Sequence, residues 1–414
     1  MTTMDSRAAV IMQQIETLAK ISSLSSGVER VYLSEQHALA NQQLMTWMQE
    51  AGLEAWQDSV GNVRGRKVSS QPTQKRLLIG SHSDTVTNAG KYDGTLGVLL
   101  AIEALAQLKD IDLPFDVDVL AFADEEGTRF NTTLIGSSGV AGCFDPKWLD
   151  IRDSQQISMA EAMLTFGLDP NKAGTDAYRP EDVGGYLEAH IEQGPVLEAQ
   201  QSSVGVVSAI AGAKRYQFEV RGMAGHAGTV PMALRQDALC GFAEMVSVIE
   251  AFAIEHNIVA TVGKCHVQGG AVNVIAGEVS FTLDIRSQSQ AQLEGCCHSL
   301  IVKLEQLAQN RHLSLNHDLL YEASAAPCSD SLQTLWKQAV QRHLGVLPST
   351  MPSGAGHDGL AIAKLTDIGM LFIRCDRGIS HHPDENVNVG DVADALGCFI
   401  EAIKLAQLPA IAKV

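Results

Sequence analysis

Histidines and carboxylates follow several apolar runs of this 414-residue chain, where strands would end. The segment Ser81–Gly94, SHSDTVTNAGKYDG, follows the apolar run LLIG and contains His82, Asp84 and Asp93. His82 and Asp84 are two residues apart, so in an extended chain their side chains point to the same side. One of them could bind a metal ion while the other orients it, or both could be solvated. Taken alone, Asp93 in KYDG is better explained as a turn aspartate that caps its own backbone.

Three consecutive carboxylates follow a second apolar run, in FADEEG at residues 122–127. They repel one another unless a cation or protons compensate, so the arrangement is costly in a buried cleft and cheap on a surface. Adjacent residues of an extended chain point opposite ways. Glu125 and Glu126 could therefore have different roles, one binding a metal ion and the other facing a metal-bound water.

Two further clusters are LEAHIEQGPVLE, with His190 and Gln193, and GISHHPDE, with His381 and His382. A lone histidine more often packs or faces solvent than binds a metal. These clusters indicate a site because they occur together, all at strand ends or loops of α/β segments. In α/β proteins, loops that meet at one edge of the sheet form the binding site. Histidines with carboxylates suit zinc, with cobalt, nickel or manganese as alternatives. A water oriented between such ions has a lowered pKa, which favours hydrolysis.

Several elements must position these residues. The first segment, RAAVIMQQIETLAKISS, predicts an amphipathic helix with Ile11, Ile15, Leu18 and Ile21 on one side. From Leu77 onward, the runs LLIG, GVLLAIEALAQL and DVDVLAFA alternate strand and helix patterns, as in an α/β domain with a largely parallel sheet. The same rhythm returns late in the chain, with a helix near Ser331–Leu344, a strand IGMLFIRC and a last helix from Asp391.

Residues 213–320 follow a different pattern. Alternating apolar residues predict strands with one buried face around residues 216–220 and 279–285. Two helices are predicted with the following apolar faces: Leu234, Ala238, Phe242, Met245, Ile249 and Ala253 in the first, and Leu293, Cys297, Leu300, Leu304 and Leu307 in the second. The order is strand, helix, strand, strand, helix, strand, the ferredoxin-like βαββαβ plan.

We therefore predict a discontinuous α/β hydrolase domain, residues 1–212 and 321–414, with the βαββαβ domain inserted at 213–320. Its four-stranded sheet leaves an exposed edge strand that must be covered or paired. A homodimer formed through the inserted domain would do this.

Composition limits the class of protein. The length suggests two domains, and 45% hydrophobic with 19% charged residues is typical of a globular protein. The formal charge of −18, from 30 basic and 48 acidic residues, disfavours nucleic acid and anionic membranes as partners. A small anionic substrate remains possible, because a local arginine or metal ion can dominate a pocket.

The eight cysteines contain no CxxC spacing, which predicts reduced, buried thiols. No apolar run reaches the length of a membrane span. We predict a cytoplasmic protein.

The motifs together resemble those of the amidase, hydantoinase and carbamoylase family of dinuclear metallo-amidohydrolases, which includes allantoate amidohydrolase, N-carbamoyl-L-amino acid hydrolase and β-ureidopropionase. The resemblance covers nearly the whole chain, and its motifs occur in the family's order. They are GSHSDTV, KYDG, DEEGTRF, HIEQGPVLE, GMAGHAGTVPM, VNVIAG, DIRS, SGAGHDG and GISHHP.

The resemblance implies two divalent ions, zinc or manganese with cobalt or nickel possible, held by His82, Asp93, Glu126, His190 and His381. Asp93 would bridge the ions, with His82 and His190 on one side and Glu126 and His381 on the other. The doubled histidine leaves His382 as an alternative to His381.

The resemblance also implies a catalytic role for three residues: Glu125 as general base, His226 as the group that polarises the substrate carbonyl from the partner subunit, and Asp84 as the carboxylate that orients His82. Asn273 and Arg286 would bind a substrate carboxylate, for which a guanidinium offers two-pronged donor geometry. Without the resemblance, an exposed strand arginine paired with Asp284 would be the favoured explanation of Arg286. Further substrate-lining positions would be Gln193, Gly356 and His357.

The family resemblance implies hydrolysis of the C–N bond of a ureido group on a small carboxylate. We favour allantoate, with an N-carbamoyl-L-amino acid as the alternative. A dipeptidase or aminopeptidase fits less well, because the related peptidases have an acidic ligand at the position of His190. A non-catalytic binding protein on the same fold is the alternative from another class.

Overall fold

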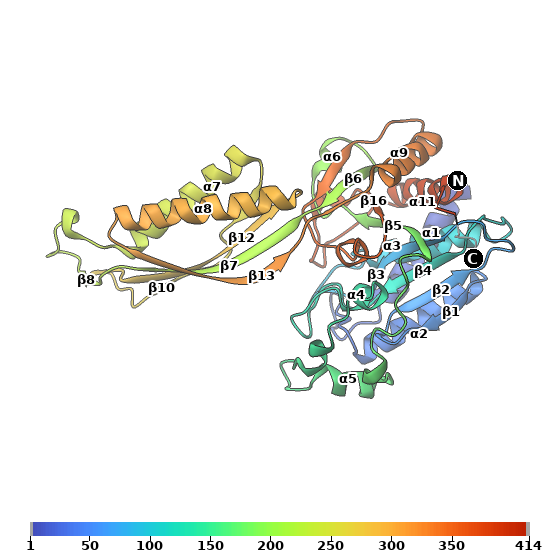
Figure 1. Cartoon of the computed structure of the whole chain (residues 1–414), viewed down its shortest axis with the longest axis horizontal. Helices are drawn as coiled ribbons and strands as arrows, with labels where there is room; N and C mark the ends of the chain where they lie inside the picture. Colours follow the sequence, from blue (N-terminus) through green and yellow to red (C-terminus); the bar gives the residue numbers. More distant parts are fainter. Residues whose placement is uncertain (1–2, 411–414) are drawn as a thin grey trace. The chain divides into compact units, whose positions relative to one another are not determined.

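The structure is a computed structural model that describes residues 3–410 and divides into two compact units. The first unit is built from the chain before Ala209 and after Pro327, and the second is Ala209–Pro327 (Figure 1). Each unit has its own sheet and its own hydrophobic core.

A nine-stranded mixed sheet has the order β1-β2-β4-β3-β5-β16-β6-β14, with β15 pairing to β6; its strands belong to the first unit except for β14 and the last two residues of β6, which belong to the second. The strands are β1 (Glu54–Gln57), β2 (Val63–Lys67), β3 (Arg76–His82), β4 (Val117–Phe122), β5 (Val183–Ile191), β6 (Val204–Ile210), β14 (Ala326–Pro327), β15 (Thr350–Ser353) and β16 (Ile368–Ile373). Strands β4, β3, β5 and β16 are neighbours and run parallel. Their carboxyl ends therefore lie along one edge of the sheet.

The first unit also contains the helices of the chain that lie outside Ala209–Pro327. They are α1 (Thr3–Ala19), α2 (Glu35–Glu50), α3 (Thr95–Gln107), α4 (Ile135–Val140), α5 (Met159–Phe166), α6 (Val196–Ala199), α9 (Asp330–Leu344), α10 (Gly359–Ile362) and α11 (Val389–Leu405). Helix α11 contacts α1, α3 and α9, and α1 contacts α3; these helices share the main core with alternate strand residues such as Ile79, Val119 and Leu371. A smaller core lies around Tyr32 and Met163.

The central strands are apolar because both of their faces are covered. Every residue of β4 and β16 is buried, as is every residue of β3 after Arg76. Such continuous apolar runs are typical of interior parallel strands. Gly80 allows β3 and β4 to approach closely, since a Cβ at that position would lie 1.9 Å from the Leu120 carbonyl oxygen.

The second unit contains an antiparallel sheet in the order β10-β12-β7-β13, with β9 pairing to β12, and a separate ribbon of β8 and β11. Its strands are β7 (Gly212–Arg221), β8 (Gly225–His226), β9 (Val259–Thr261), β10 (Cys265–Gln268), β11 (Val274–Ile275), β12 (Glu278–Ser287) and β13 (Ser314–Ala323). The helices α7 (Ala238–His256) and α8 (Gln290–Asn310) pack on β7 and β12.

Most predicted core positions are confirmed. Burial alternates strictly along β12, and the predicted apolar face of α8 is buried. Leu234 is the exception in α7: it lies in a short 3₁₀ turn before the helix and is 74% exposed. The helix begins only at Ala238, because Asp237 caps it by accepting from the amides of Leu239 and Cys240.

Two smaller expectations are wrong. Ile21 lies beyond the end of α1. All eight cysteines are free thiols, but Cys240 and Cys265 are exposed and Cys143 is half-buried, so only five are buried as predicted. Among the described helices, none combines the length and the apolar character that crossing a bilayer requires.

Candidate metal centre

The predicted ligands lie at the carboxyl edge of the parallel strands. His82 is the last residue of β3, His190 is next to last in β5, and Glu126 follows the end of β4. Asp93 lies just before α3, and His381 lies in the segment that follows β16. The connections between these strands bring together residues that are far apart in the chain.

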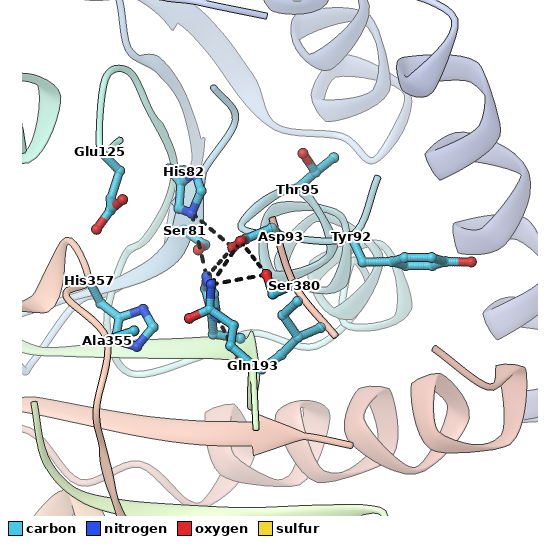
Figure 2. A network of polar contacts seen from close by, with 12 residues as sticks. Ser81, His82, Tyr92, Asp93, Thr95, Glu125, Gln193, Ala355, His357 and Ser380 are labelled. Atoms are coloured by element: carbon cyan, nitrogen blue, oxygen red, sulfur yellow. Dashed lines mark hydrogen bonds and ion pairs between the residues drawn. The ribbon is translucent and has the colours of Figure 1, made fainter. Parts of the chain in front are cut away.

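Asp93 is at the centre of the group (Figure 2). Its Oδ1 lies 3.0 Å from Nε2 of His190 and 3.5 Å from Nε2 of His82. Its Oδ2 lies 3.2 Å from Nε2 of His381, which is itself 3.6 Å from Oε1 of Glu126. The two carboxylate oxygens thus face two different sets of partners.

Three overlapping groups of possible ligand atoms, each within 4.8 Å of one another, result from this arrangement: His82, Asp93 and His190; Asp93, Glu126 and His381; and His82, Glu125 and Glu126. Oδ1 of Asp93 is buried and accepts no hydrogen bond from the described residues. A buried carboxylate oxygen without a donor is costly. Imidazole nitrogens and carboxylate oxygens suit zinc and manganese, so the residues present fit a divalent metal ion.

The two buried histidines hold the tautomer that a metal ligand needs. Nδ1 of His82 is 3.1 Å from the backbone carbonyl of Asp84, and Nδ1 of His190 is 2.8 Å from that of Ile191. A carbonyl oxygen only accepts, so each Nδ1 carries the proton. Each Nε2 is therefore directed at Asp93.

Asp84 lies next to both His82 and the turn that carries the two glutamates. Its carboxylate lies 3.6 Å from Nδ1 of His82, too far for a short hydrogen bond, and it is the Asp84 backbone carbonyl that orients the ring. The carboxylate accepts instead from the amides of Glu125 (3.0 Å) and Glu126 (3.2 Å). Asp84 therefore holds the turn that carries the two glutamates.

The backbone around the site adopts conformations that non-glycine residues rarely occupy. Asp124, Gln193 and His381 have φ values of 60°, 57° and 55°. At Asp124 the chain leaves the extended form assumed from the sequence, so Glu125 and Glu126 share one group of ligand atoms with His82 and do not point opposite ways. Gly94, with φ 62°, leaves room for the His82 ring, since a Cβ there would lie 2.4 Å from it.

The carboxylates have strongly altered acidity. Burial raises the pKa of Glu125 well above its usual range. Burial, reinforced by Asp93, raises the pKa of Glu126 to about 7. Burial also opposes ionisation of Asp93, but the histidines around it outweigh burial and hold its pKa well below the usual range. Asp93 is thus the carboxylate of the group that ionises most readily, and a cation would favour ionisation of the two glutamates as well.

Glu385 and Ser380, which the sequence did not single out, connect two of the ligand loops. Oε1 of Glu385 accepts from the amides of Tyr92 (2.8 Å) and Asp93 (3.0 Å), and Oε2 accepts from Ser380 Oγ (3.0 Å). Ser380 Oγ also lies 2.8 Å from Oδ2 of Asp93, and Nε2 of Gln193 donates to the same oxygen at 2.8 Å. The only available signal was their place in the motif GISHHPDE.

The structure distinguishes the paired histidines. His381 lies within the group described above, whereas Nδ1 of His382 accepts from the Asp384 amide at 3.1 Å and its ring is exposed. His382 is therefore not among the possible ligands.

The predicted substrate positions Gly356 and His357 also lie at this site. A Cβ on Gly356 would be 3.9 Å from Oε1 of Glu125. The His357 ring is buried and meets the His190 ring edge-on, with centroids 4.4 Å apart. Burial, reinforced by His190, lowers the pKa of His357 well below its usual range.

The remaining predicted residues belong to the second unit. His226 in β8 is exposed, and its neighbour Ala227 donates its amide to the Asn273 carbonyl at 2.9 Å, so His226 and Asn273 are close together. Arg286 is near the other end of β12 and forms two hydrogen bonds with Asp284, at 2.8 and 3.1 Å. The alternative pairing predicted for Arg286 is thus present.

Comparison with known proteins agrees with this geometry. The family model "Peptidase family M20/M25/M40" matches residues 78–405. An allantoate deiminase from Arabidopsis thaliana is 38% identical over 94% of this chain and 81% of its own, and an N-carbamoyl-L-amino acid amidohydrolase from Geobacillus stearothermophilus is 39% identical over 87% and 89%. A crystal structure of a hydantoinase/carbamoylase family amidase from Burkholderia multivorans superposes with a TM-score of 0.89 at 28% identity, covering 96% of this chain and 97% of that one.

These matches confirm the resemblance inferred from the motifs. The sheet edge, the Asp93-centred ligand group and the three comparisons agree with one another, and the chain belongs to peptidase family M20/M25/M40.

Proposed function

We propose that this protein is a metal-dependent amidohydrolase that cleaves the C–N bond of a ureido group on a small carboxylate substrate. The observation that carries the proposal is the position of Asp93 between two sets of possible ligands, with the buried Glu125 in the overlapping third group. Allantoate, converted to ureidoglycine, ammonia and CO₂, is the first candidate substrate. An N-carbamoyl-L-amino acid is the second, because relatives of both names match this chain at almost equal identity.

The residues would hold two divalent ions, zinc or manganese, with cobalt or nickel as alternatives. His82, His190 and Asp93 would bind one ion, and Asp93, Glu126 and His381 the other. When bound, such ions supply positive charge that polarises a carbonyl group and lowers the pKa of water.

Glu125 has the properties of the general base. It is buried, its pKa is raised by that burial, and Gly356, which has no side chain, lies beside its carboxylate. A base of raised pKa takes a proton from water as the new C–O bond forms and still returns it to the leaving nitrogen as the C–N bond breaks. The amides of Glu125 and Glu126 are fixed by Asp84, so the base is held in place by the backbone.

His226, Asn273 and Arg286 are proposed to contact the substrate. The β8–β11 ribbon continues from the end of the sheet where β12 begins, with Gly222 donating to the Gly277 carbonyl. From Glu278 to Arg286, β12 spans about 26 Å at ~3.3 Å per residue. A small substrate cannot reach both ends of this strand, so if all three residues serve one substrate, they come from two copies of the chain.

The surface around His226 supports a homodimer. Met223, Met232, Leu234 and Val272 are large apolar residues with exposures of 66%, 75%, 74% and 107%. Neighbouring exposed apolar side chains are typical of interaction surfaces. The proposed occupant is a second copy of this chain, which would place His226 and Asn273 in its partner's site.

The first experiment is ammonia release by the zinc- or manganese-loaded protein. Allantoate, a panel of N-carbamoyl-L-amino acids and a dipeptide are compared side by side. Turnover of allantoate alone supports the first candidate, and preference for a carbamoyl amino acid supports the second. Cleavage of the dipeptide alone would make the protein a peptidase, and no turnover of any compound by the loaded protein would return it to a binding role.

A further inference from the structure

Ser353 forms a buried hydrogen bond with the His357 ring. Ser353 ends β15, which pairs with β6, and its side chain is completely buried. Its Oγ lies 2.7 Å from Nε2 of His357. Neither the sequence analysis nor the proposed reaction assigns Ser353 a role.

The hydrogen bonds of Ser353 determine the direction of this contact. The hydroxyl has one proton to donate and two lone pairs with which to accept. Its Oγ accepts from the Ala355 amide at 3.1 Å and lies in donating geometry 3.1 Å from the Ala355 carbonyl. That carbonyl can only accept, so satisfying all three contacts requires Oγ to donate to Ala355 and to accept from Nε2 of His357. In the reverse arrangement, Oγ and the carbonyl oxygen of Ala355 would face each other without a proton.

His357 is therefore protonated at Nε2, and its Nδ1 retains a lone pair. Nδ1 is buried and has no hydrogen-bond partner among the described residues. The ring itself is held in place against His190 and Phe372, with centroid distances of 4.4 and 6.0 Å. Figure 2 shows His357 on the same side of the ligand group as Glu125, in agreement with the approach of Gly356 to that carboxylate.

We propose that Ser353 is a positioning residue that fixes the tautomer of His357, so that Nδ1 accepts a hydrogen bond from an N–H of the substrate's ureido group. The inference rests on the proposed function for the identity of the substrate group. The tautomer itself follows from this chain alone. A ureido group supplies N–H donors next to the carbonyl that is attacked, and an unpaired buried acceptor discriminates strongly against a compound without a matching donor.

The first test is direct observation of the tautomer in the zinc-loaded protein. Selective ¹⁵N-histidine labelling separates protonated from unprotonated ring nitrogens by chemical shift, and His357 is assigned by its absence from the His357→Asn spectrum. We expect a protonated Nε2 and an unprotonated Nδ1. In Ser353→Ala we expect the His357 signals to move towards a mixture of tautomers, and in Ser353→Thr, which keeps a hydroxyl, to return. A wild-type ring protonated at Nδ1, or a tautomer unchanged in Ser353→Ala, would overturn the proposal.

The second test uses turnover. Ser353→Ala should lower kcat/KM on the order of tenfold or more, the size typical of losing a group that orients an imidazole, while zinc content is retained. An asparagine amide can place its oxygen near the position of Nδ1, whereas a glutamine amide extends towards that of Nε2. His357→Asn should therefore retain more kcat/KM than His357→Gln. The opposite order in correctly folded, zinc-loaded variants contradicts the acceptor role.

The two tests also separate this inference from the proposed function. If no ureido compound is turned over, the proposed function and the substrate contact both fail, and the spectra alone decide whether Ser353 sets the tautomer. If ureido compounds are turned over but the tautomer is wrong, only the present inference fails.

Discussion

Oδ1 of Asp93 lies 3.0 Å from Nε2 of His190, and the opposite ring nitrogen of that histidine is bound to a backbone carbonyl. The carbonyl fixes the proton on Nδ1, so Nε2 can face the carboxylate only as a metal ligand or as the carrier of a second proton. Metal and protons therefore compete for the same atoms, and several predictions depend on this competition or on the residues around it.

Replacing Glu125 with Gln should abolish turnover while the metal content is unchanged. The amide keeps the size of the side chain but cannot accept and return a proton, so we expect a fall in kcat of at least about a hundredfold. Ammonia release and metal analysis on the same sample check this. Glu192→Gln is the matched control, since Glu192 is also buried but binds the amides of Val196 and Leu197, away from the ligand group. Full activity of Glu125→Gln would refute the assignment.

The neighbouring histidines offer a matched pair. His381→Ala should lose roughly one of the two proposed metal equivalents, because only His381 approaches Asp93 and Glu126. His382→Ala should bind metal like the wild type, since within residues 3–410 the polar contacts of its ring are with Asp384. Metal content after dialysis distinguishes the two variants. Equal losses, or a loss confined to His382→Ala, would show that the ligand is misassigned.

Glu385→Gln should weaken metal binding without removing a ligand. The change weakens the acceptor for the Tyr92 and Asp93 amides and for Ser380, which together hold the Asp93 and His381 loops. We expect a loss of metal affinity on the order of 10- to 100-fold, as is typical for residues that orient ligands. Competition with a metal chelator measures it. The exposed neighbour Asp384→Asn is the control, and affinities equal to wild type in both variants would exclude a role for Glu385.

Arg286→Ala should raise KM with little change in kcat, because a guanidinium that binds a substrate carboxylate contributes mainly to binding. Loss of a charged hydrogen bond corresponds to an increase of roughly 10- to 100-fold. Arg215→Ala is a close control, since Arg215 also pairs with Asp284, at 2.8 Å. Equal kinetics for the two variants would leave Arg286 with only its structural pairing to Asp284.

Metal affinity should rise with pH between about 6 and 9. The Asp93 carboxylate, opposed by partial burial, raises the pKa of His381 to about 9, and Glu126 has a pKa of about 7, so below these values protons occupy ligand atoms. Metal binding near pH 7 should therefore release protons. Calorimetric titrations in buffers of different ionisation enthalpy measure this release, and an enthalpy independent of the buffer would contradict it.

The raised pKa of His381 also determines how the stability of the metal-free protein changes with pH. The pKa of His381 is higher in the folded state than its ordinary value of 6.5, so its contribution is fully present below pH 6.5 and is lost as pH rises through about 9. The contribution of the buried Glu126 is likewise lost as pH rises, but already between its ordinary value of 4.5 and its raised pKa of about 7. The unfolding temperature of the metal-free protein should consequently fall over this range, and the fall should be smaller in His381→Ala.

The sequence by itself determined which loops carry the chemistry and which faces are buried. Strand ends and two-residue or 3.6-residue periodicity are local properties, so the meeting of His82, Asp93 and His190 at one sheet edge and the alternating burial of β12 were predictable. Local capping was also encoded, but it acted against the predicted periodicity: Asp237 starts α7 after Leu234 and leaves that apolar residue exposed.

Only the tertiary structure decided which atoms of these residues contact one another. The Asp84 carboxylate accepts from the Glu125 amide, whereas the Asp84 carbonyl orients His82. His381, and not His382, approaches Asp93. Ser353 forms a hydrogen bond with the His357 ring. These partners are selected by packing between distant segments and by the positive φ at residues such as Asp124 and His381, which the intrinsic preferences of those residues disfavour. A periodic pattern specifies the side of an element on which a residue lies. The choice of hydrogen-bonding atom depends on ångström-scale distances that exist only once the chain has folded.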